Sequence, residues 1–287
     1  MSLTSIMKGG FSKVIVANFP IPRNRFEPSK SCIACPRTSN YSLIGTAFDY
    51  LFRSEIKRVH PDAKEGTLIA EASISLVRQS INRNGIFLAR SGQIGGRELS
   101  AMVSVADLYR NERESFLASG SLSNKYLETT IRFARMDAVF RAATYDDVEK
   151  DVDAKDIEDM KALYDLIPEY FKNIQGQILL DPDFGKVSRI VGGADVDMII
   201  GDTMIDIKTT KEMKLDDYVW SQLVGYLILS DEAHKVNGSF PIIEKLGIYF
   251  SRFGRLWLIG ADYARNNSNY NSVSKQLLDL GAKLFGN

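Results

Sequence analysis

The 287-residue chain is poor in cysteine and histidine and has no excess of charge of either sign. Cys32 and Cys35 form a Cys-Ile-Ala-Cys-Pro segment, which suits a redox pair or half of a metal site. Neither histidine, His60 or His234, lies at ligand spacing from this segment, which favours plain packing of the two thiols. The 36 Lys and Arg residues balance 36 Asp and Glu residues. Nucleic-acid-binding proteins are more often basic, so a phosphate-binding surface here must be a local patch or come from a partner.

The chain also lacks long apolar runs. No stretch of about 18 apolar residues is present, so no membrane span is expected. The first twenty residues have no apolar segment followed by a small-residue cleavage site, which argues against a signal peptide. Two cysteines suit a reducing compartment, and the expected location is therefore the cytoplasm.

What is present is typical of a globular α/β protein. Hydrophobic residues make up 45% of the chain and charged residues 25%, which is ordinary for a soluble domain with a real core. We expect one composite domain in three parts. These are an N-terminal segment with the first core helix (1–61), a helical region (62–175), and a sheet with its helices (176–287).

The expected elements follow from periodicity. Residues 1–40 contain four of the eight prolines and are expected to be irregular. Apolar residues at helical spacing predict a helix beginning at Tyr41 and further helices at 65–83, 98–118, 123–143 and 153–173. The pattern then becomes strand-like, with strands at 178–180 and 188–191, a hairpin at 196–208, a helix beginning near 217, a second hairpin at 246–261 and a final helix at 271–285.

The chain is organised around residues 191–226, in which Gly201-Asp202 separates two β-rich runs. A two-residue turn of this composition predicts a hairpin. It sets Ile200 opposite Thr203 and Asp197 opposite Asp206. Because side chains alternate between sheet faces, we expect one apolar face and one face carrying Asp195, Asp197, Asp206 and Lys208, with Asp195 opposite Lys208.

This polar face is a candidate metal site. Directly opposed residues have Cβ atoms roughly 5 Å apart, and two carboxylates at that distance repel unless a cation or proton lies between them. Hard carboxylate oxygens suit Mg²⁺ or Mn²⁺. The alternative is an exposed polar face with one ordinary Asp–Lys pair. Three acidic groups and a lysine are more than a solvated strand needs, which favours a site.

Two neighbouring segments bear on the same site. Gln222 and Tyr226 are four residues apart on the helix expected after Asp216, so they share one face and could contact the hairpin carboxylates. Lys211 and Lys214 could meet phosphates or be ordinary surface lysines. Asp49 lies between apolar neighbours in the first helix and could be a surface residue or point into a polar site.

These segments, in this order, resemble the PD-(D/E)xK nuclease superfamily and, within it, the RecB-like exonuclease branch. Residues 192–200 resemble the first metal-binding strand and Asp206-Ile207-Lys208 the (D/E)xK strand. Gln222-Leu-Val-Gly-Tyr226 resembles the Q-x3-Y helix of that branch. Cys35-Pro-Arg and the helix reaching Asp49 resemble its CP segment and first helix. The motifs touch about a fifth of the chain.

The resemblance implies a restriction-endonuclease-like fold, a mixed sheet flanked by helices with a helical insertion between the first helix and the sheet. It implies Asp197 and Asp206 as carboxylate ligands of Mg²⁺ or Mn²⁺, the Ile207 carbonyl as a third ligand, and Asp49 completing the site. Lys208 would orient or deprotonate the attacking water, and Gln222 and Tyr226 would position the substrate phosphate or a catalytic group. Asp195 remains either a metal ligand or the charge that holds Lys208.

Two departures from the family pattern stand out. Asp49 occupies the place where close members have His, and two cysteines cannot hold the four-cysteine iron–sulfur cluster of some members. The expected function is metal-dependent hydrolysis of phosphodiester bonds, as a DNA exonuclease in repair or defence, with a protein partner or homo-oligomer possible. The alternatives are an inactive nuclease-fold binding or assembly subunit and a hydrolase of small phosphates.

Overall fold

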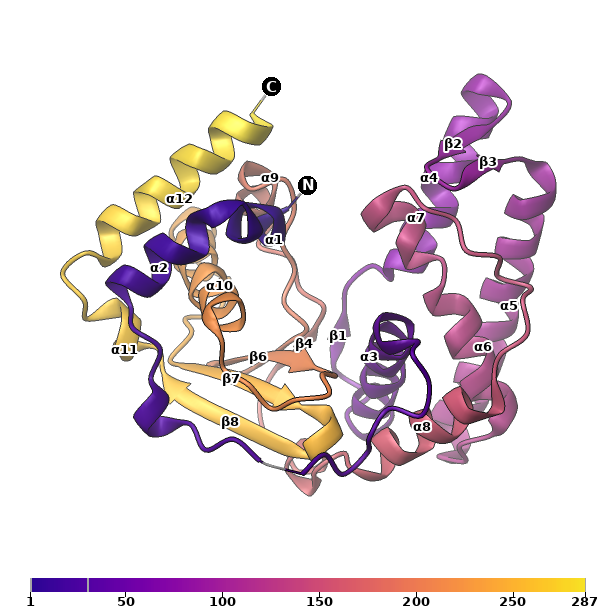
Figure 1. The fold of residues 1–287 in the computed structure, drawn as a ribbon, viewed down its shortest axis with the longest axis horizontal. Helices are drawn as coiled ribbons and strands as arrows, with labels where there is room; N and C mark the ends of the chain where they lie inside the picture. Colours follow the sequence, from indigo (N-terminus) through magenta and orange to yellow (C-terminus); the bar gives the residue numbers. More distant parts are fainter. Residues whose placement is uncertain (1, 30, 287) are drawn as a thin grey trace.

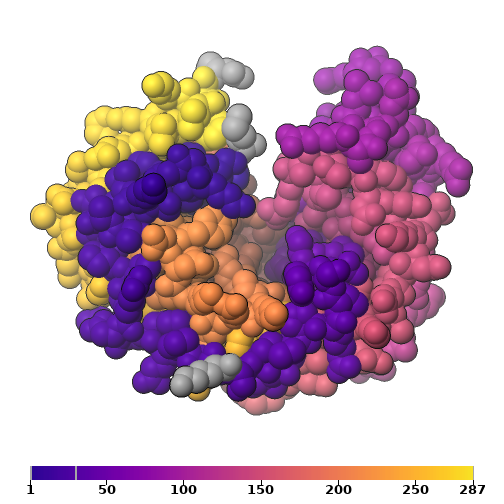
Figure 2. Space-filling view, viewed as in Figure 1, coloured from indigo at the N-terminus to yellow at the C-terminus, as the bar shows by residue number. Residues whose placement is uncertain are grey.

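The computed structural model describes residues 2–29 and 31–286, and they form an α/β fold of two halves. One half contains the sheet with helices of both chain ends, and the other is a group of helices (Figure 1). The helix α3 (Tyr41–Val59) runs between them. Figure 2 shows that the surface is hollowed between the two halves.

The main sheet of the described residues has six strands in the order β1-β4-β5-β6-β7-β8. It is mixed: β1 pairs parallel with β4, and β6 pairs parallel with β7, while the other neighbours are antiparallel. The strand bounds are β1 Lys64–Glu65, β4 Ile178–Leu180, β5 Met198–Ile200, β6 Thr203–Lys208, β7 Lys245–Phe250 and β8 Arg255–Gly260.

The hairpin register predicted from the turn is confirmed. Ile200 pairs with Thr203 and Met198 with Ile205. Gly201 has a φ of 56°, which a residue with a Cβ adopts only at a cost. The glycine therefore explains why the chain turns here, and the turn fixes which residues face each other.

The first strand of the hairpin is shorter than predicted. Val196 lies outside β5, its amide donates to the carbonyl of Pro182 on the other side, and Asp195 bridges to Asp183. The residues before Met198 are therefore not paired with β6 and lie only alongside the residues that follow β4. The predicted pairing of Asp195 with Lys208 is wrong for this reason, and the predicted pair of Asp197 and Asp206 lies just beyond the end of the β5–β6 ladder.

The alternative of an exposed polar face is wrong, because helices cover both faces of the sheet. Met198, Ile200 and Ile205 pack in one core with α3, and Val196, Ile199 and Met204 pack in a second core with α10 (Asp217–Val236). Asp216 caps α10 by accepting the amide of Val219, as an N-cap does. Asp206 is thus carried on a buried face.

The helical region was predicted well. Its helices are α4 Ile69–Asn84, α5 Gly96–Ser119, α6 Asn124–Ala134, α7 Asp137–Ala142 and α8 Ala154–Asp165, with a small hairpin of β2 Phe87–Ala89 and β3 Gly92–Ile94. Two predicted helices differ: 123–143 is divided into α6 and α7, and 153–173 ends at Asp165, with a separate 3-10 turn at Glu169–Lys172. The helices α5, α6 and α8 pack against α3.

The N-terminal prediction was wrong in part. Residues expected to be irregular form α1 (Leu3–Ile6), a π-helical turn (Met7–Phe11) and α2 (Ser12–Asn18), which pack against α10. The apolar side chains of these helices are buried in the second core, so tertiary contacts stabilise helices that could not be predicted from a segment rich in proline. The predicted strand at 188–191 is instead the end of α9 (Lys186–Ile190).

The C-terminal predictions are confirmed. After β8 come the short α11 (Asp262–Arg265) and α12 (Tyr270–Phe285). The aromatic side chains of the second hairpin, for which core packing was favoured over base stacking, are buried: Tyr249, Phe250, Phe253 and Trp257.

The Cys32–Cys35 loop is fixed to the end of β7. The amides of Ile33 and Ala34 donate to the carbonyl of Arg252, whose guanidinium donates to the Ala34 carbonyl and pairs with Asp159 of α8 at 2.7 Å. Both thiols are free. Within the described ranges, no helix is both long and apolar enough to span a membrane.

Candidate functional site

The site is centred on Asp197, which lies where β5 separates from β6. Its Oδ2 accepts the backbone N–H of Ile207 at 2.5 Å. In a continuous ladder that amide would bond a strand carbonyl, so the side chain takes the place of the missing backbone partner. This fixes the carboxylate in the gap between the strands.

A chain of side-chain contacts lies behind this carboxylate. Lys208 pairs with Asp206 at 2.6 Å and donates to Oε1 of Gln222 at 2.9 Å. The amide nitrogen of Gln222 donates to the hydroxyl of Tyr226 at 2.8 Å. The predicted Gln–Tyr face of α10 therefore does contact the hairpin, through Lys208.

The charges in this group perturb one another. Burial raises the pKa of Asp197 well above its usual range, and the negative charges of Asp206 and Asp49 raise it further. Burial lowers the pKa of Lys208, but the charges of Asp206 and Asp197 outweigh it, so the net pKa is raised. Burial also raises the pKa of the Tyr226 hydroxyl. Lys208 is thus a fixed positive charge, and it lowers the pKa of Asp197 too little to offset burial and the two carboxylates.

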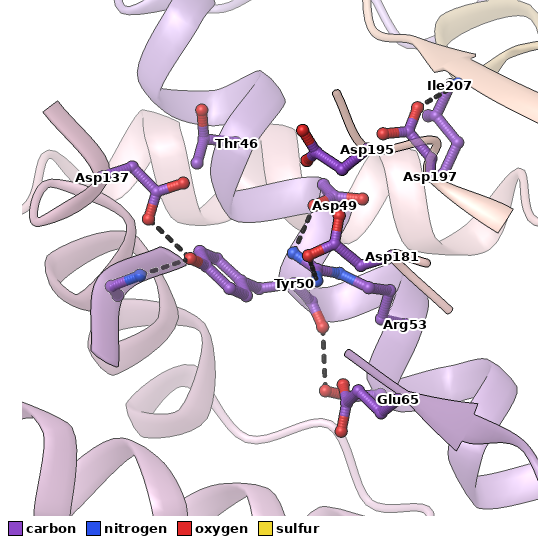
Figure 3. A network of polar contacts seen from close by, with 12 residues as sticks. Thr46, Asp49, Tyr50, Arg53, Glu65, Asp137, Asp181, Asp195, Asp197 and Ile207 are labelled. Carbon is purple, nitrogen blue, oxygen red and sulfur yellow. Dashed lines mark hydrogen bonds and ion pairs between the residues drawn. The ribbon is translucent and has the colours of Figure 1, made fainter. Parts of the chain in front are cut away.

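Asp49 faces this group from α3 and is held by Arg53, one turn later on the same helix. The Arg53 guanidinium pairs with Asp49 at 2.5 Å and with Asp181 at 3.0 Å (Figure 3). The second oxygen of Asp49, Oδ1, is buried and has no hydrogen-bond partner among the described residues. Burial raises the pKa of Asp49. An unpartnered buried carboxylate oxygen is costly and suits a cation.

Asp181 directly follows β4 and takes a φ of 53°, a left-handed conformation that is uncommon outside glycine. Its amide donates to the carbonyl of Asp197, so the two residues lie opposite each other on neighbouring chains. Burial raises the pKa of Asp181 to about 7.

The helical region reaches the site through α7. Asp137 accepts the hydroxyl of Tyr50 at 2.5 Å, and that hydroxyl accepts the amide of Ala70, which ties α7 to α3 and α4. Arg141, one turn later on α7, lies 3.6 Å from Asp195 and 3.7 Å from Asp137. Its side chain is 55% exposed.

Asp49 and Asp197 line one cavity of about 520 Å³. Two cationic side chains, Arg141 and Lys211, line it as well. Ile207 and hydroxyl-bearing residues complete much of the wall: Tyr41, Ser42, Thr46, Thr209 and Thr210. Asp206 and Lys208 do not line it but lie behind Asp197. The cavity therefore combines carboxylates, positive charge and hydrogen-bond donors.

The donor chemistry of this cavity fits Mg²⁺ or Mn²⁺. Three carboxylates line it, Asp49, Asp137 and Asp197. Asp137 accepts the Tyr50 hydroxyl, whereas the repulsion between Asp197 and Asp49, which has a buried unpartnered oxygen, favours a cation between these two. Within residues 2–29 and 31–286, no three His, Cys, Asp or Glu side chains converge as a complete ligand set. Mg²⁺ is commonly held by one or two carboxylates, with waters and substrate phosphates as further ligands, so two carboxylates suffice.

The structure thus brings together Asp49, Asp197 and Ile207 at the cavity, with Asp206, Lys208, Gln222 and Tyr226 behind them. Asp195 lies to one side with Arg141. Sequence reasoning missed Arg53, Asp137, Arg141 and Asp181. The i,i+4 spacing of Asp49 and Arg53 was a signal for Arg53. Asp181 directly follows the predicted strand 178–180, but only the antiparallel pairing found in the structure places it opposite Asp197. Nothing local indicated Asp137 or Arg141.

Neither a protein-family model nor a curated protein sequence matches this chain.

Proposed function

We propose that the protein is a metal-dependent nuclease of the PD-(D/E)xK type that hydrolyses phosphodiester bonds, as a DNA exonuclease. The observation that carries this proposal is the placement of the Asp197 carboxylate. It sits in a gap of the sheet, faces Asp49 across a cavity, and is backed by the Asp206–Lys208–Gln222–Tyr226 chain.

The fold supports the same proposal. A mixed sheet is flanked by α3 and α10, and the helices α4 to α8 lie in sequence between α3 and β4. This agrees with the restriction-endonuclease-like core with a helical insertion that the sequence motifs imply.

Each residue has a role in the proposed reaction. Asp197 and Asp49 would hold Mg²⁺ or Mn²⁺, which when bound polarises the phosphoryl oxygen and lowers the pKa of a water. Lys208 does not line the cavity, so its positive charge would act on the phosphate from behind the Asp197 carboxylate. Asp206 and Gln222 fix the Lys208 ammonium, and Tyr226 fixes the Gln222 amide.

The test is a cleavage assay with labelled linear and circular DNA, single-stranded and duplex, and RNA, with Mn²⁺ or with EDTA. We expect metal-dependent degradation of linear DNA but not of circular DNA. Asp206→Ala should abolish it, whereas Asp202→Asn, in the exposed turn of the same hairpin, should retain it. Wild-type cleavage by Asp206→Ala would refute the proposal. Turnover of nucleotides without cleavage of polynucleotides would indicate a small-phosphate hydrolase.

One observation favours an inactive binding or assembly subunit as the second candidate. The Asp206 carboxylate is paired with the Lys208 ammonium and does not line the cavity, so it is not free to hold a metal there. Titration calorimetry with Mn²⁺ separates the candidates, because this subunit would bind no metal and cleave none of the substrates.

A further inference from the structure

A second cavity, of about 600 Å³, lies near the first. Asp195 lines the second cavity and Arg141 the first, so their ion pair connects the two walls. Both cavities lie between residues of the sheet half and residues of the helical half, the region hollowed in Figure 2.

The two cavities differ in charge. The first has two cations, Arg141 and Lys211, for its three carboxylates, so it is the less acidic of the two and has a guanidinium and an ammonium to offer to a phosphate. The second is lined by Glu65, Asp181, Asp183 and Asp195 with one cation, Lys64, so it repels phosphate. Its remaining lining is largely apolar, with two aromatic rings, Phe140 and Phe240.

Two consecutive residues of α7 line these two cavities, one residue each. Phe140 lines the second cavity with 51% of its surface exposed, and Arg141 lines the first. A phosphate group and a base are the two chemically different parts of one nucleotide. The guanidinium fork suits phosphate oxygens, and an exposed aromatic ring suits base stacking.

The guanidinium of Arg141 has few contacts within the protein, which leaves it available to a ligand. Its nearest carboxylate oxygens are 3.6 and 3.7 Å away, beyond hydrogen-bond length, and within the described chain its N–H groups donate no hydrogen bond. Arg53, in the same cluster, is 3% exposed and holds two carboxylates at 2.5 and 3.0 Å. Arg53 is therefore structural, whereas Arg141 has donors to offer to a phosphate.

We propose that α7 binds one unpaired nucleotide of the substrate, with Arg141 on a phosphate beside Asp197 and the base in the second cavity, stacked on Phe140. This inference rests on the proposed function and specifies its substrate as a single strand, because a paired base is not available for stacking. The acidic lining of the second cavity can accept a hydrogen bond from an N–H group on the edge of an unpaired base, such as N3–H of thymine.

The experiment compares binding of two labelled probes, oligo(dT) of six residues and the matching abasic hexamer, which has the same phosphates without bases. Fluorescence anisotropy is measured with Ca²⁺ at several salt concentrations, and gels confirm that the probes stay intact. Wild type should bind the dT probe about tenfold more tightly than the abasic probe.

Each variant has its own expected signature. Phe140→Ala should remove the preference for the dT probe, and Phe140→Trp should keep it. Arg141→Ala should weaken the binding of both probes equally and reduce the slope of log affinity against log salt concentration by about 0.7. Arg141→Lys should keep the slope. The matched controls, Leu88→Ala and Arg97→Ala on exposed residues of the helical region, should behave as wild type.

The inference is overturned if Phe140→Ala keeps the preference for bases, if Arg141→Ala keeps the salt slope, or if wild type binds neither probe. Failure of the proposed function looks different. Wild type would then show the expected binding and yet cleave no DNA with Mn²⁺.

Discussion

The Asp197 carboxylate accepts the backbone amide of Ile207, the residue between Asp206 and Lys208. A side chain thus provides the hydrogen bond that the neighbouring strand would otherwise supply. The carboxylate is fixed by the fold and needs no bound ligand to keep its position, although Lys208 compensates its charge only in part.

The first prediction follows from the charge of the Asp197 carboxylate, which Lys208 compensates only in part. Asp197→Asn retains an oxygen for the Ile207 amide but removes the repulsion with Asp206 and Asp49. In EDTA at pH 8, the free energy of unfolding should rise, on the order of 1 kcal/mol. Metal binding and hydrolysis should be lost. The measurements are urea denaturation, calorimetry with Mn²⁺ and the cleavage assay; a variant less stable than wild type in EDTA would contradict this account.

The second prediction concerns the Lys208–Gln222–Tyr226 chain. Gln222→Leu leaves the Lys208 ammonium and the Tyr226 hydroxyl without this partner. We expect hydrolysis to fall about 10–100-fold, as for other groups that orient a catalytic residue, and stability to fall by about 1–3 kcal/mol. Tyr226→Phe removes only the hydrogen bond between Gln222 and the Tyr226 hydroxyl and should reduce the rate of hydrolysis less than Gln222→Leu. Equal rates for Gln222→Leu and wild type would show that Lys208 needs no positioning.

The third prediction uses two ion pairs of α8 that differ in burial. Arg252 and Asp159 are almost fully buried, whereas Arg37 and Glu158 are exposed. Arg252→Met leaves Asp159 as an uncompensated buried charge and should reduce the free energy of unfolding by about 3–5 kcal/mol. Arg37→Met, the matched control, should cost about 0–1 kcal/mol. Chemical denaturation measures the free energy of unfolding of both variants. Similar losses would show that the buried Arg252–Asp159 pair contributes no more to stability than the exposed pair.

The fourth prediction is a pH dependence of stability. Burial raises the pKa of Asp137 to about 6 in the folded protein, above the value of about 4 expected for the unfolded chain. The folded state therefore keeps a proton that the unfolded state has released. Stability from this group is greatest below about pH 4 and falls as pH rises to about 6, by at most about 3 kcal/mol.

Asp137→Asn tests that dependence, because the amide oxygen can still accept the Tyr50 hydroxyl. Denaturation curves in EDTA from pH 4 to 7 should show a smaller fall for the variant than for wild type. Asp49, Asp181 and Asp197 also have raised pKa values, so both proteins keep part of the slope. Parallel curves would mean that Asp137 titrates normally.

Local sequence determined the elements and one register. The glycine turn after Ile200 sets the pairing of β5 with β6, and this pairing is local because two residues connect the strands. Helical spacing likewise placed Gln222 and Tyr226 on one face of α10. The helices of the N-terminal segment were not predictable, because their stability comes from packing against α10, far away in the sequence.

The tertiary structure decided how the site is assembled. The separation of β5 from β6 depends on competing bonds to the chain after β4, so local pairing rules placed Asp195 wrongly. Arg141 reaches the cavity only because Tyr50 and Asp137 fix α7 beside α3, a contact between residues 87 positions apart. Sequence alone thus determined the hairpin with its acidic residues and the lysine, and long-range packing decided which of them face the cavity and which cations join them.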